Sequence, residues 1–169
     1  IDPSESDPII NIIKNEKINL KYILNTHHHD DHVGGNLKLK KEFNCSILGY
    51  IDDKKIIPGI DVLLNDNQIY KDDDFEFITY HTPGHTNGHV IFHFFKQNFL
   101  FTGDTLFSLG CGRIFEGTKA QMYSSLVLIK KLPLKTKIFF GHEYTKKNSE
   151  FCANYDPKNQ KLMNKIEEI

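Results

Sequence analysis

Histidines and aspartates are concentrated in one short segment, residues 26–36, which reads THHHDDHVGGN. An apolar run leads into this segment, so we expect it to follow a buried strand. Side chains alternate faces along an extended backbone, which places His27, His29 and Asp31 on one side, with His32 beside them as a helix begins. Neutral imidazoles and carboxylates are ligands of zinc, iron and manganese. The spacing therefore predicts a site that can serve two metal ions.

Three further candidate ligands follow apolar runs elsewhere in the chain. His85 follows a Pro-Gly turn, Asp104 follows residues 99–101, and His142 follows residues 138–140. Functional side chains are concentrated in loops at the ends of regular elements. Together with the first segment, these residues give five histidines and two aspartates. That set suits two metal ions that share one carboxylate and leave open positions for a bridging water.

The remaining histidines have other expected roles. His28 lies on the opposite face of the extended segment, so we leave it out of the ligand set. His81 and His93 fall within strand patterns and are expected to be structural or exposed. His89 is close enough to the second ligand loop to orient a ligand from behind. Asp104, taken alone, would also suit a turn that it caps through its side chain.

The three cysteines, Cys45, Cys111 and Cys152, are scattered and form no C-x-x-C motif or disulfide framework. They favour a reducing, intracellular compartment. Cys111 lies in a Gly-Cys-Gly loop near the predicted site, but no histidine or lysine beside it would activate a thiol. We expect it to be a small buried residue and not a nucleophile.

Length and charge limit the function classes. The chain has 169 residues, which predicts a single domain over residues 1–169 with a substantial core. Its formal net charge of −1 gives no electrostatic reason to expect nucleic acid or an anionic membrane as a partner. No apolar run approaches the roughly 20 residues of a membrane span. We expect a monomer in the cytoplasm, with no targeting segment visible.

Short strands and helices alternate along the chain, which predicts an α/β fold of packed sheets with helices outside. The helix at residues 33–43 is expected to turn both Leu37 and Leu39 partly inward. An acidic turn at residues 72–74 is expected at a solvated hairpin tip. The expected helices are 9–17, 33–43, 122–132 and the polar region beyond 145, and the expected strands are 20–24, 46–48, 61–70, 75–80, 90–95, 99–101 and 138–140.

These motifs resemble the metallo-β-lactamase superfamily, and within it the glyoxalase II (hydroxyacylglutathione hydrolase) family. The segments that carry the resemblance are THHHDDHVGGN at 26–36, TPGHTNGH at 82–89, FTGDTLFSLGCGRIFEG at 101–117 and GHEYT at 141–145. The resemblance implies a four-layer αβ/βα sandwich with the site at one edge. Family members begin with extra strands and finish with a helical segment. We therefore expect this chain to lack the N-terminal strands and to hold, at 155–169, the start of a truncated C-terminal helical region.

The resemblance also implies how the ligands are divided and which reaction they serve. The family hydrolyses S-D-lactoylglutathione to D-lactate and glutathione, the second step of methylglyoxal detoxification. Zinc is the expected metal, with iron and manganese as alternatives. The implied ligands are His27, His29 and His85 for the first metal, Asp31, His32 and His142 for the second, and Asp104 bridging both.

The residue chemistry is compatible with this reaction. A bound metal lowers the pKa of water from 15.7 to about 7 and polarises a carbonyl. Asp31 can ligate one metal and accept a hydrogen bond from the bridging hydroxide, and a thiolate leaves without a strong general acid. For glutathione, the resemblance implies contacts from Arg113, Phe115 and Tyr144. Arg113 stands where a lysine is usual and Phe115 where a tyrosine is usual, so one hydrogen bond is lost.

Three other interpretations remain open from the sequence. A persulfide dioxygenase shares the first motif but uses one iron and leaves the second ligand set unused. A lactonase or β-lactamase is the second alternative, although β-lactamases of this superfamily usually carry a cysteine where Asp104 sits. The third is a non-catalytic binding module that retains the fold. Such relatives tend to lose ligands, whereas all seven are present here.

Overall fold

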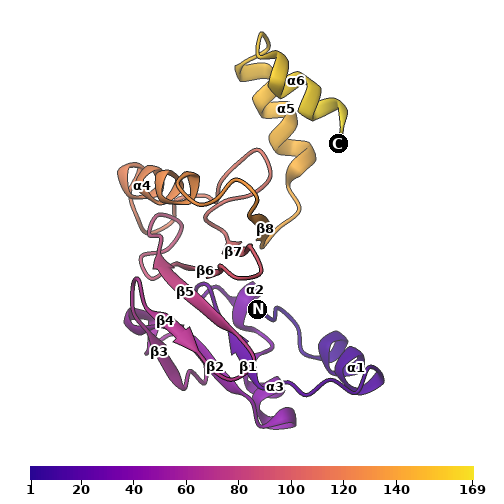
Figure 1. Cartoon of the computed structure of the whole chain (residues 1–169), viewed down its shortest axis with the longest axis vertical. Coiled ribbons are helices and arrows are strands. Elements are labelled where there is room, and N and C mark those ends of the chain that lie inside the picture. The colour runs from indigo at the N-terminus through magenta and orange to yellow at the C-terminus, as the bar shows by residue number, and fades with distance from the viewer.

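Two β-sheets form the centre of the fold, and the computed structural model describes all 169 residues (Figure 1). The small sheet is parallel and has the order β1-β2-β3, with β1 at Tyr22–Leu24, β2 at Ser46–Tyr50 and β3 at Val62–Leu64. The large sheet has the order β4-β5-β6-β7-β8 and is antiparallel except for the parallel β7–β8 pair. Its strands are Ile69–Lys71, Glu76–His81, Val90–Phe94, Phe99–Gly103 and Lys137–Phe140.

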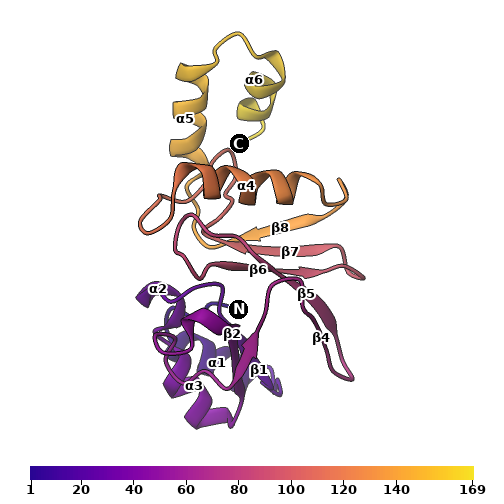
Figure 2. The same cartoon turned by 90° about the vertical axis from the view of Figure 1, so that its left-hand side faces the viewer.

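Helices cover the outer face of each sheet (Figure 2). Helices α1 and α3 lie against the small sheet, α4 runs across the large sheet, and α5 and α6 project beyond α4. No helix is both long enough and apolar enough to cross a bilayer. The helices are α1 (Asp7–Asn15), α2 (Asp30–Val33), α3 (Asn36–Phe43), the short 3₁₀ helix η1 (Ile51–Asp53), α4 (Lys119–Lys130), α5 (Thr145–Tyr155) and α6 (Gln160–Glu167).

Strand alternation divides the core into three apolar layers. Ile23 and Ile47 face the helices of the small sheet, whereas their neighbours Leu24 and Leu48 face the large sheet. A third layer lies between the large sheet and α4 and contains Ile91, Leu100 and Ile129. The order helix, sheet, sheet, helix confirms the four-layer αβ/βα expectation. Full burial of each such side chain contributes about 1.5–3 kcal/mol, so the middle layer holds the two sheets together.

One expected strand is split between the two sheets. Residues 61–70 were predicted as a single strand, but β3 ends at Leu64 in the small sheet and β4 begins at Ile69 in the large one. The polar segment between them includes Asn67, whose φ of 58° lies in the left-handed region that asparagine tolerates. This turn is where the chain passes from one sheet to the other. The other expected strands lie within a few residues of the observed ones.

The expected helix over residues 33–43 is also interrupted. Gly34 and Gly35 separate the four-residue α2 from α3. The prediction that Leu37 turns partly inward is wrong, because Leu37 is 59% exposed whereas Leu39 is 1% exposed. Residues two positions apart lie on nearly opposite faces of an α-helix, so both side chains cannot face one core.

Helix α4 begins with a capping box and supports a loop of the predicted site. The Thr118 hydroxyl accepts a hydrogen bond from the Gln121 backbone N–H at 3.2 Å, and Gln121 Oε1 accepts one from the Thr118 N–H at 2.8 Å. One turn further, the Ser125 hydroxyl donates to the Pro83 carbonyl at 2.9 Å. The start of α4 thus fixes the loop that follows β5.

Replacing Thr118 with alanine should destabilise the protein by about 0.5–2 kcal/mol, the usual contribution of an N-cap hydroxyl. Urea unfolding of the Thr118→Ala variant measures this difference in the free energy of unfolding. Thr118→Ser keeps the hydroxyl and serves as the matched control. Equal stability of the alanine and serine variants would show that the capping box contributes nothing.

Candidate metal centre

The seven predicted ligands come from four segments at strand ends. The segment after β1 supplies two histidines and leads into α2, which supplies an aspartate and a histidine. The loops after β5, β7 and β8 supply one residue each. Their donor atoms fall into overlapping groups in which all atoms lie within 4.8 Å of one another. The groups are His27, His29 and His85, then His27, His32 and Asp104, then Asp31, His32 and His142.

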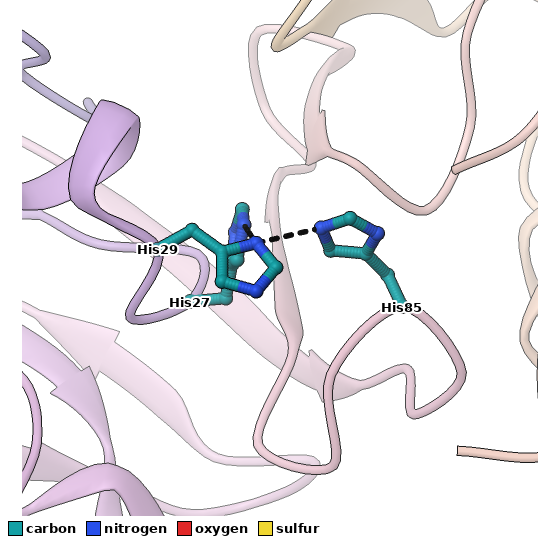
Figure 3. Close-up of side chains that lie close together, drawn as sticks. All are labelled: His27, His29 and His85. Atoms are coloured by element: carbon teal, nitrogen blue, oxygen red, sulfur yellow. Dashed lines mark hydrogen bonds between the residues drawn. The ribbon is translucent and has the colours of Figure 1, made fainter. Parts of the chain in front are cut away.

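Three imidazoles form the first group, and His29 lies between His27 and His85 (Figure 3). His29 Nδ1 is 3.1 Å from His27 Nε2 and 3.0 Å from His85 Nε2. The first two residues come from the segment after β1, and the third comes from the loop after β5. Each ring presents a nitrogen to the same small space.

Asp31, His32 and His142, called the second group below, adjoin the first group through the carboxylate of Asp104. His142 Nε2 lies 3.2 Å from His32 Nε2 and 3.2 Å from Asp31 Oδ2. Asp104 stands between the groups, with Oδ2 3.4 Å from His142 Nε2 and 3.5 Å from His85 Nε2. The structure therefore brings all seven predicted ligand residues together, and Asp104 occupies the position between the two sets.

Hydrogen bonds on the far side of the rings fix which nitrogen carries the proton. His85 Nδ1 lies 2.7 Å from the Arg113 carbonyl oxygen, which can only accept. The Thr26 hydroxyl donates to Asp2 Oδ2 at 2.8 Å and so accepts from His27 Nδ1 at 2.9 Å. The Nε2 atoms of His27 and His85 are therefore unprotonated, and their lone pairs point into the same space. Such lone pairs are positioned to bind a cation.

A buried carboxylate oxygen gives a second test of whether these residues fit bound metal ions. Asp104 Oδ1 is buried and has no hydrogen-bond partner. Burial raises the pKa of the Asp104 carboxyl group, because an unpaired buried charge is costly. A cation at this position would remove that cost. Neutral imidazole nitrogens together with carboxylate oxygens are a donor set that divalent metal ions accept, so the residues present fit two such ions.

Burial also sets the protonation of the histidines. It lowers the pKa of His27 and His29, and it lowers the pKa of His85 to about 4. These rings are neutral at neutral pH, the form that binds metal. Burial also acts to lower the pKa of His32, but the carboxylates around it, Asp2 first among them, raise the pKa overall. A metal ion would replace the proton that those carboxylates attract.

Asp2 supports both groups, a role that the sequence motifs do not indicate. Its Oδ1 accepts a hydrogen bond from the Thr26 backbone N–H at 2.8 Å, and its Oδ2 lies 3.2 Å from His32 Nδ1. Through the Thr26 hydroxyl it also orients His27. No local pattern connects Asp2 with residues 24 to 30 positions away, so only the tertiary structure reveals this contact.

His89 lies behind the centre, where the sequence suggested a supporting role. The Asp104 backbone N–H donates to His89 Nε2 at 3.0 Å, and the His89 ring stacks on His27 with centroids 4.9 Å apart. Its Nδ1 faces two threonine hydroxyls. Gly103 has a φ of 47°, and a Cβ at that position would overlap Thr26 Oγ1. A glycine is therefore needed just before Asp104.

The histidines left out of the ligand set lie outside both groups. His28 is held between the carboxylates of Asp53 and Glu116. His93 is buried within β6, and the ring of His81 stacks on a tyrosine. The placements of His81 and His93 agree with the expectation that they are structural or exposed, and His28 lies outside the ligand groups as expected.

The expectation that Cys111 is buried is wrong, because its side chain is exposed. The buried member of the loop is Gly112, where a Cβ would overlap the Asp104 carbonyl oxygen. Cys111 has a glycine on each side. The loop buries Gly112, which has no side chain, and leaves the Cys111 thiol exposed.

The three predicted substrate contacts surround the two groups. The Arg113 guanidinium lies 5.2 Å from the centre of the Phe115 ring. Phe115 is 58% exposed and packs edge-on against His29 in the first group. Tyr144 is stacked on His142 of the second group with centroids 5.2 Å apart. A basic group and two aromatic rings therefore lie at the exposed side of the centre.

Comparison with known proteins places this geometry in a family. The model of the metallo-beta-lactamase superfamily matches residues 1–142. Over all 169 residues the chain is 56% identical to a hydroxyacylglutathione hydrolase of Pelagibacter ubique and 43% identical to one of Methylococcus capsulatus. The chain therefore belongs to the hydroxyacylglutathione hydrolases of the metallo-beta-lactamase superfamily. It spans 71% of the Pelagibacter relative and 66% of the Methylococcus relative.

Solved structures share the superfamily fold. The B3 metallo-beta-lactamase BLEG-1 superposes with a TM-score of 0.78 and 27% identity, covering 84% of this chain and 79% of that one. ETHE1 from Myxococcus xanthus superposes with a TM-score of 0.72 and 26% identity, covering 82% and 60%. The resemblance inferred from the four sequence motifs is confirmed at the level of superfamily and family.

Acidification should destabilise the metal-free protein. The pKa of His85 is about 4 in the fold against an ordinary value of 6.5, so between these values the unfolded chain binds a proton that the folded chain does not. The free energy of unfolding then decreases as the pH falls, by up to about 1.4 kcal/mol per pH unit for one proton. Urea unfolding across this window, with metal-free His85→Asn as the reference, isolates the contribution. Parallel pH profiles for the two proteins would contradict it.

Proposed function

We propose that this chain is a binuclear metal-dependent thioester hydrolase that converts S-D-lactoylglutathione and water into D-lactate and glutathione. The observation that carries the proposal is the arrangement of seven donors in two sets that share Asp104. The relatives named hydroxyacylglutathione hydrolase support the choice of substrate. The complete second set also favours the hydrolase over a persulfide dioxygenase with one iron.

Two divalent ions are the proposed cofactors, with zinc first and iron or manganese as alternatives. When bound, they supply an activated water near neutral pH and electrophilic stabilisation of the developing oxyanion. The proposed ligands of the first ion are His27, His29 and His85, those of the second are Asp31, His32 and His142, and Asp104 serves both.

Asp31 is the proposed residue that orients the attacking water. Its carboxylate is 55% exposed and lies 3.2 Å from His142 Nε2, so it faces both the solvent and the centre. There the carboxylate can accept a hydrogen bond from the water. This bond would direct a lone pair of the water oxygen towards the thioester carbonyl. A cavity of about 420 Å³ opens beside it, lined by Asp31, His32 and His142 together with N-terminal residues and residues of β7 and β8. The exposed Cys111 has no histidine or lysine beside it in the sequence that would activate its thiol, which argues against a cysteine nucleophile.

Arg113, Phe115 and Tyr144 are the proposed contacts of the glutathione portion. A guanidinium forms bidentate hydrogen bonds with a carboxylate, and glutathione carries two carboxylates. The Phe115 ring contacts both the Arg113 guanidinium and His29 of the first group. The monomeric state, the cytoplasmic location and the single domain over residues 1–169 stay predictions.

Thiol release from S-D-lactoylglutathione by the metal-loaded protein tests the proposed function. We expect hydrolysis by the wild type and a loss of about 100-fold or more in Asp104→Ala, together with a decrease from two bound ions per chain. Colorimetric detection of the thiol and elemental analysis measure both quantities. Two bound ions without thiol release would exclude the glutathione thioester as the substrate, and lactones and persulfides would then be tested.

Removing the Arg113 side chain should raise KM more than it lowers kcat. One charged hydrogen bond contributes about 1.5–3 kcal/mol, so Arg113→Ala should lower kcat/KM for the glutathione thioester by roughly 10- to 100-fold. Arg113→Lys keeps the charge and should retain most of the affinity. Steady-state kinetics measure both variants, and an alanine variant with an unchanged KM would exclude Arg113 as a substrate contact.

A further inference from the structure

His28, which the ligand set leaves out, is held between two carboxylates. His28 Nδ1 lies 3.1 Å from Asp53 Oδ2, and its Nε2 lies 3.1 Å from Glu116 Oε1. Asp53 closes η1 and is only 4% exposed. Both ring nitrogens are thus in contact with a carboxylate oxygen. The orientation of this ring is fixed from two directions.

The same carboxylates contact the loop that carries His85. Glu116 Oε2 accepts a hydrogen bond from the Asn87 backbone N–H at 2.7 Å. The carboxylate of Asp53 lies directly against Gly88, where an added Cβ would overlap it. A side chain at Gly88 would therefore displace Asp53. The contacts join the segment after β1, η1, the loop after β5 and the loop around Glu116.

The last of these segments, residues 113–117, carries the proposed glutathione contacts and has no regular secondary structure. Backbone N–H groups of Phe115 and Glu116 donate to the His85 carbonyl at 3.1 and 3.4 Å. The side chains of Arg113 and Phe115 are exposed above these bonds. The Glu116 side chain adds a second attachment, to His28 in the segment after β1.

We propose that His28, Asp53 and Glu116 form a positioning triad that fixes residues 113–117 above the metal centre and thereby sets the affinity for the glutathione portion of the substrate. This inference rests on the proposed function. Alternation along the segment turns His27 and His29 towards the centre and His28 away from it. One short segment therefore holds both the ligands and the loop, and a loop ordered in advance lowers the entropic cost of binding.

Kinetics of Glu116→Ala and His28→Ala with two substrates test the triad. The substrates are S-D-lactoylglutathione and S-D-lactoyl-2-mercaptoethanol, which has no carboxylate to contact the loop. We expect a roughly 10-fold rise in KM for the first substrate, the effect of losing one charged hydrogen bond. Its kcat, the kinetics of the small thioester and the content of two metal ions should stay unchanged. A protein that was merely misfolded would lose metal and both activities together.

Two variants serve as matched controls. Glu116→Gln keeps an acceptor for the Asn87 N–H and should restore part of the affinity. Glu76→Gln removes a carboxylate of the same kind from the Glu76–Lys96 ion pair, which joins β5 to the turn after β6 and lies outside the triad. It should leave KM unchanged.

Calorimetric titration of the metal-loaded proteins with S-methylglutathione measures the same affinity without turnover. We expect the dissociation constant to rise in Glu116→Ala and His28→Ala as KM does. If the wild type binds this ligand but hydrolyses no thioester, the proposed reaction fails while the triad is still tested. The triad is overturned if both alanine variants keep the wild-type affinity, or if they lose metal and activity towards both substrates equally.

Discussion

The inward-pointing lone pairs of buried imidazoles are the constraint on which the centre of this structure depends. His27 and His85 each use one ring nitrogen for a hydrogen bond with the fold and turn the other towards the same space. Asp104 adds a carboxylate oxygen with no hydrogen-bond partner. Groups of this kind repel one another in a dry interior unless a cation lies among them. Binding of divalent ions by these groups would therefore be thermodynamically coupled to folding.

The four-layer architecture holds those groups at their spacing. The proposed ligands in the segment after β1 are attached to the small sheet, whereas those after β7 and β8 are attached to the large sheet. The apolar layer between the sheets fixes the position of the residues attached to one sheet relative to those attached to the other. Leu48, Phe77 and Phe92 in this layer are completely buried. A close-packed layer of this kind transmits small displacements. The packing of the core therefore also determines the geometry of the site.

Burial divides the site into a fixed side and an exposed side. His27, His89 and Asp104 are buried. His27 Nδ1 donates a hydrogen bond to the Thr26 hydroxyl, and the Asp104 backbone N–H donates one to His89 Nε2. Asp31 and Phe115 face solvent, where a substrate would arrive. The buried side, which carries most of the proposed cation ligands, has little freedom to rearrange. The exposed side, where we propose that the substrate binds, depends on how its loop is held.

The sequence by itself determined the ligand types, their order and the family, because these are encoded in short motifs such as His27-x-His29 and in apolar runs that end at a polar residue. It also determined the layered α/β fold, since alternation along strands specifies which face is buried. Tertiary packing decided what the strand pattern did not, since residues 61–70 divide between two sheets. The exposure of Leu37 follows from helix geometry once Leu39 faces the core.

Only the tertiary structure decided which residues support the site. Asp2 contacts the ligand segment across 24 positions, and Asp53 contacts His28 across 25. No periodicity connects residues so far apart, because their proximity follows from how the two sheets and their loops pack. Ligand chemistry is a local property of residue type and spacing. The support of those ligands is a property of the folded chain as a whole.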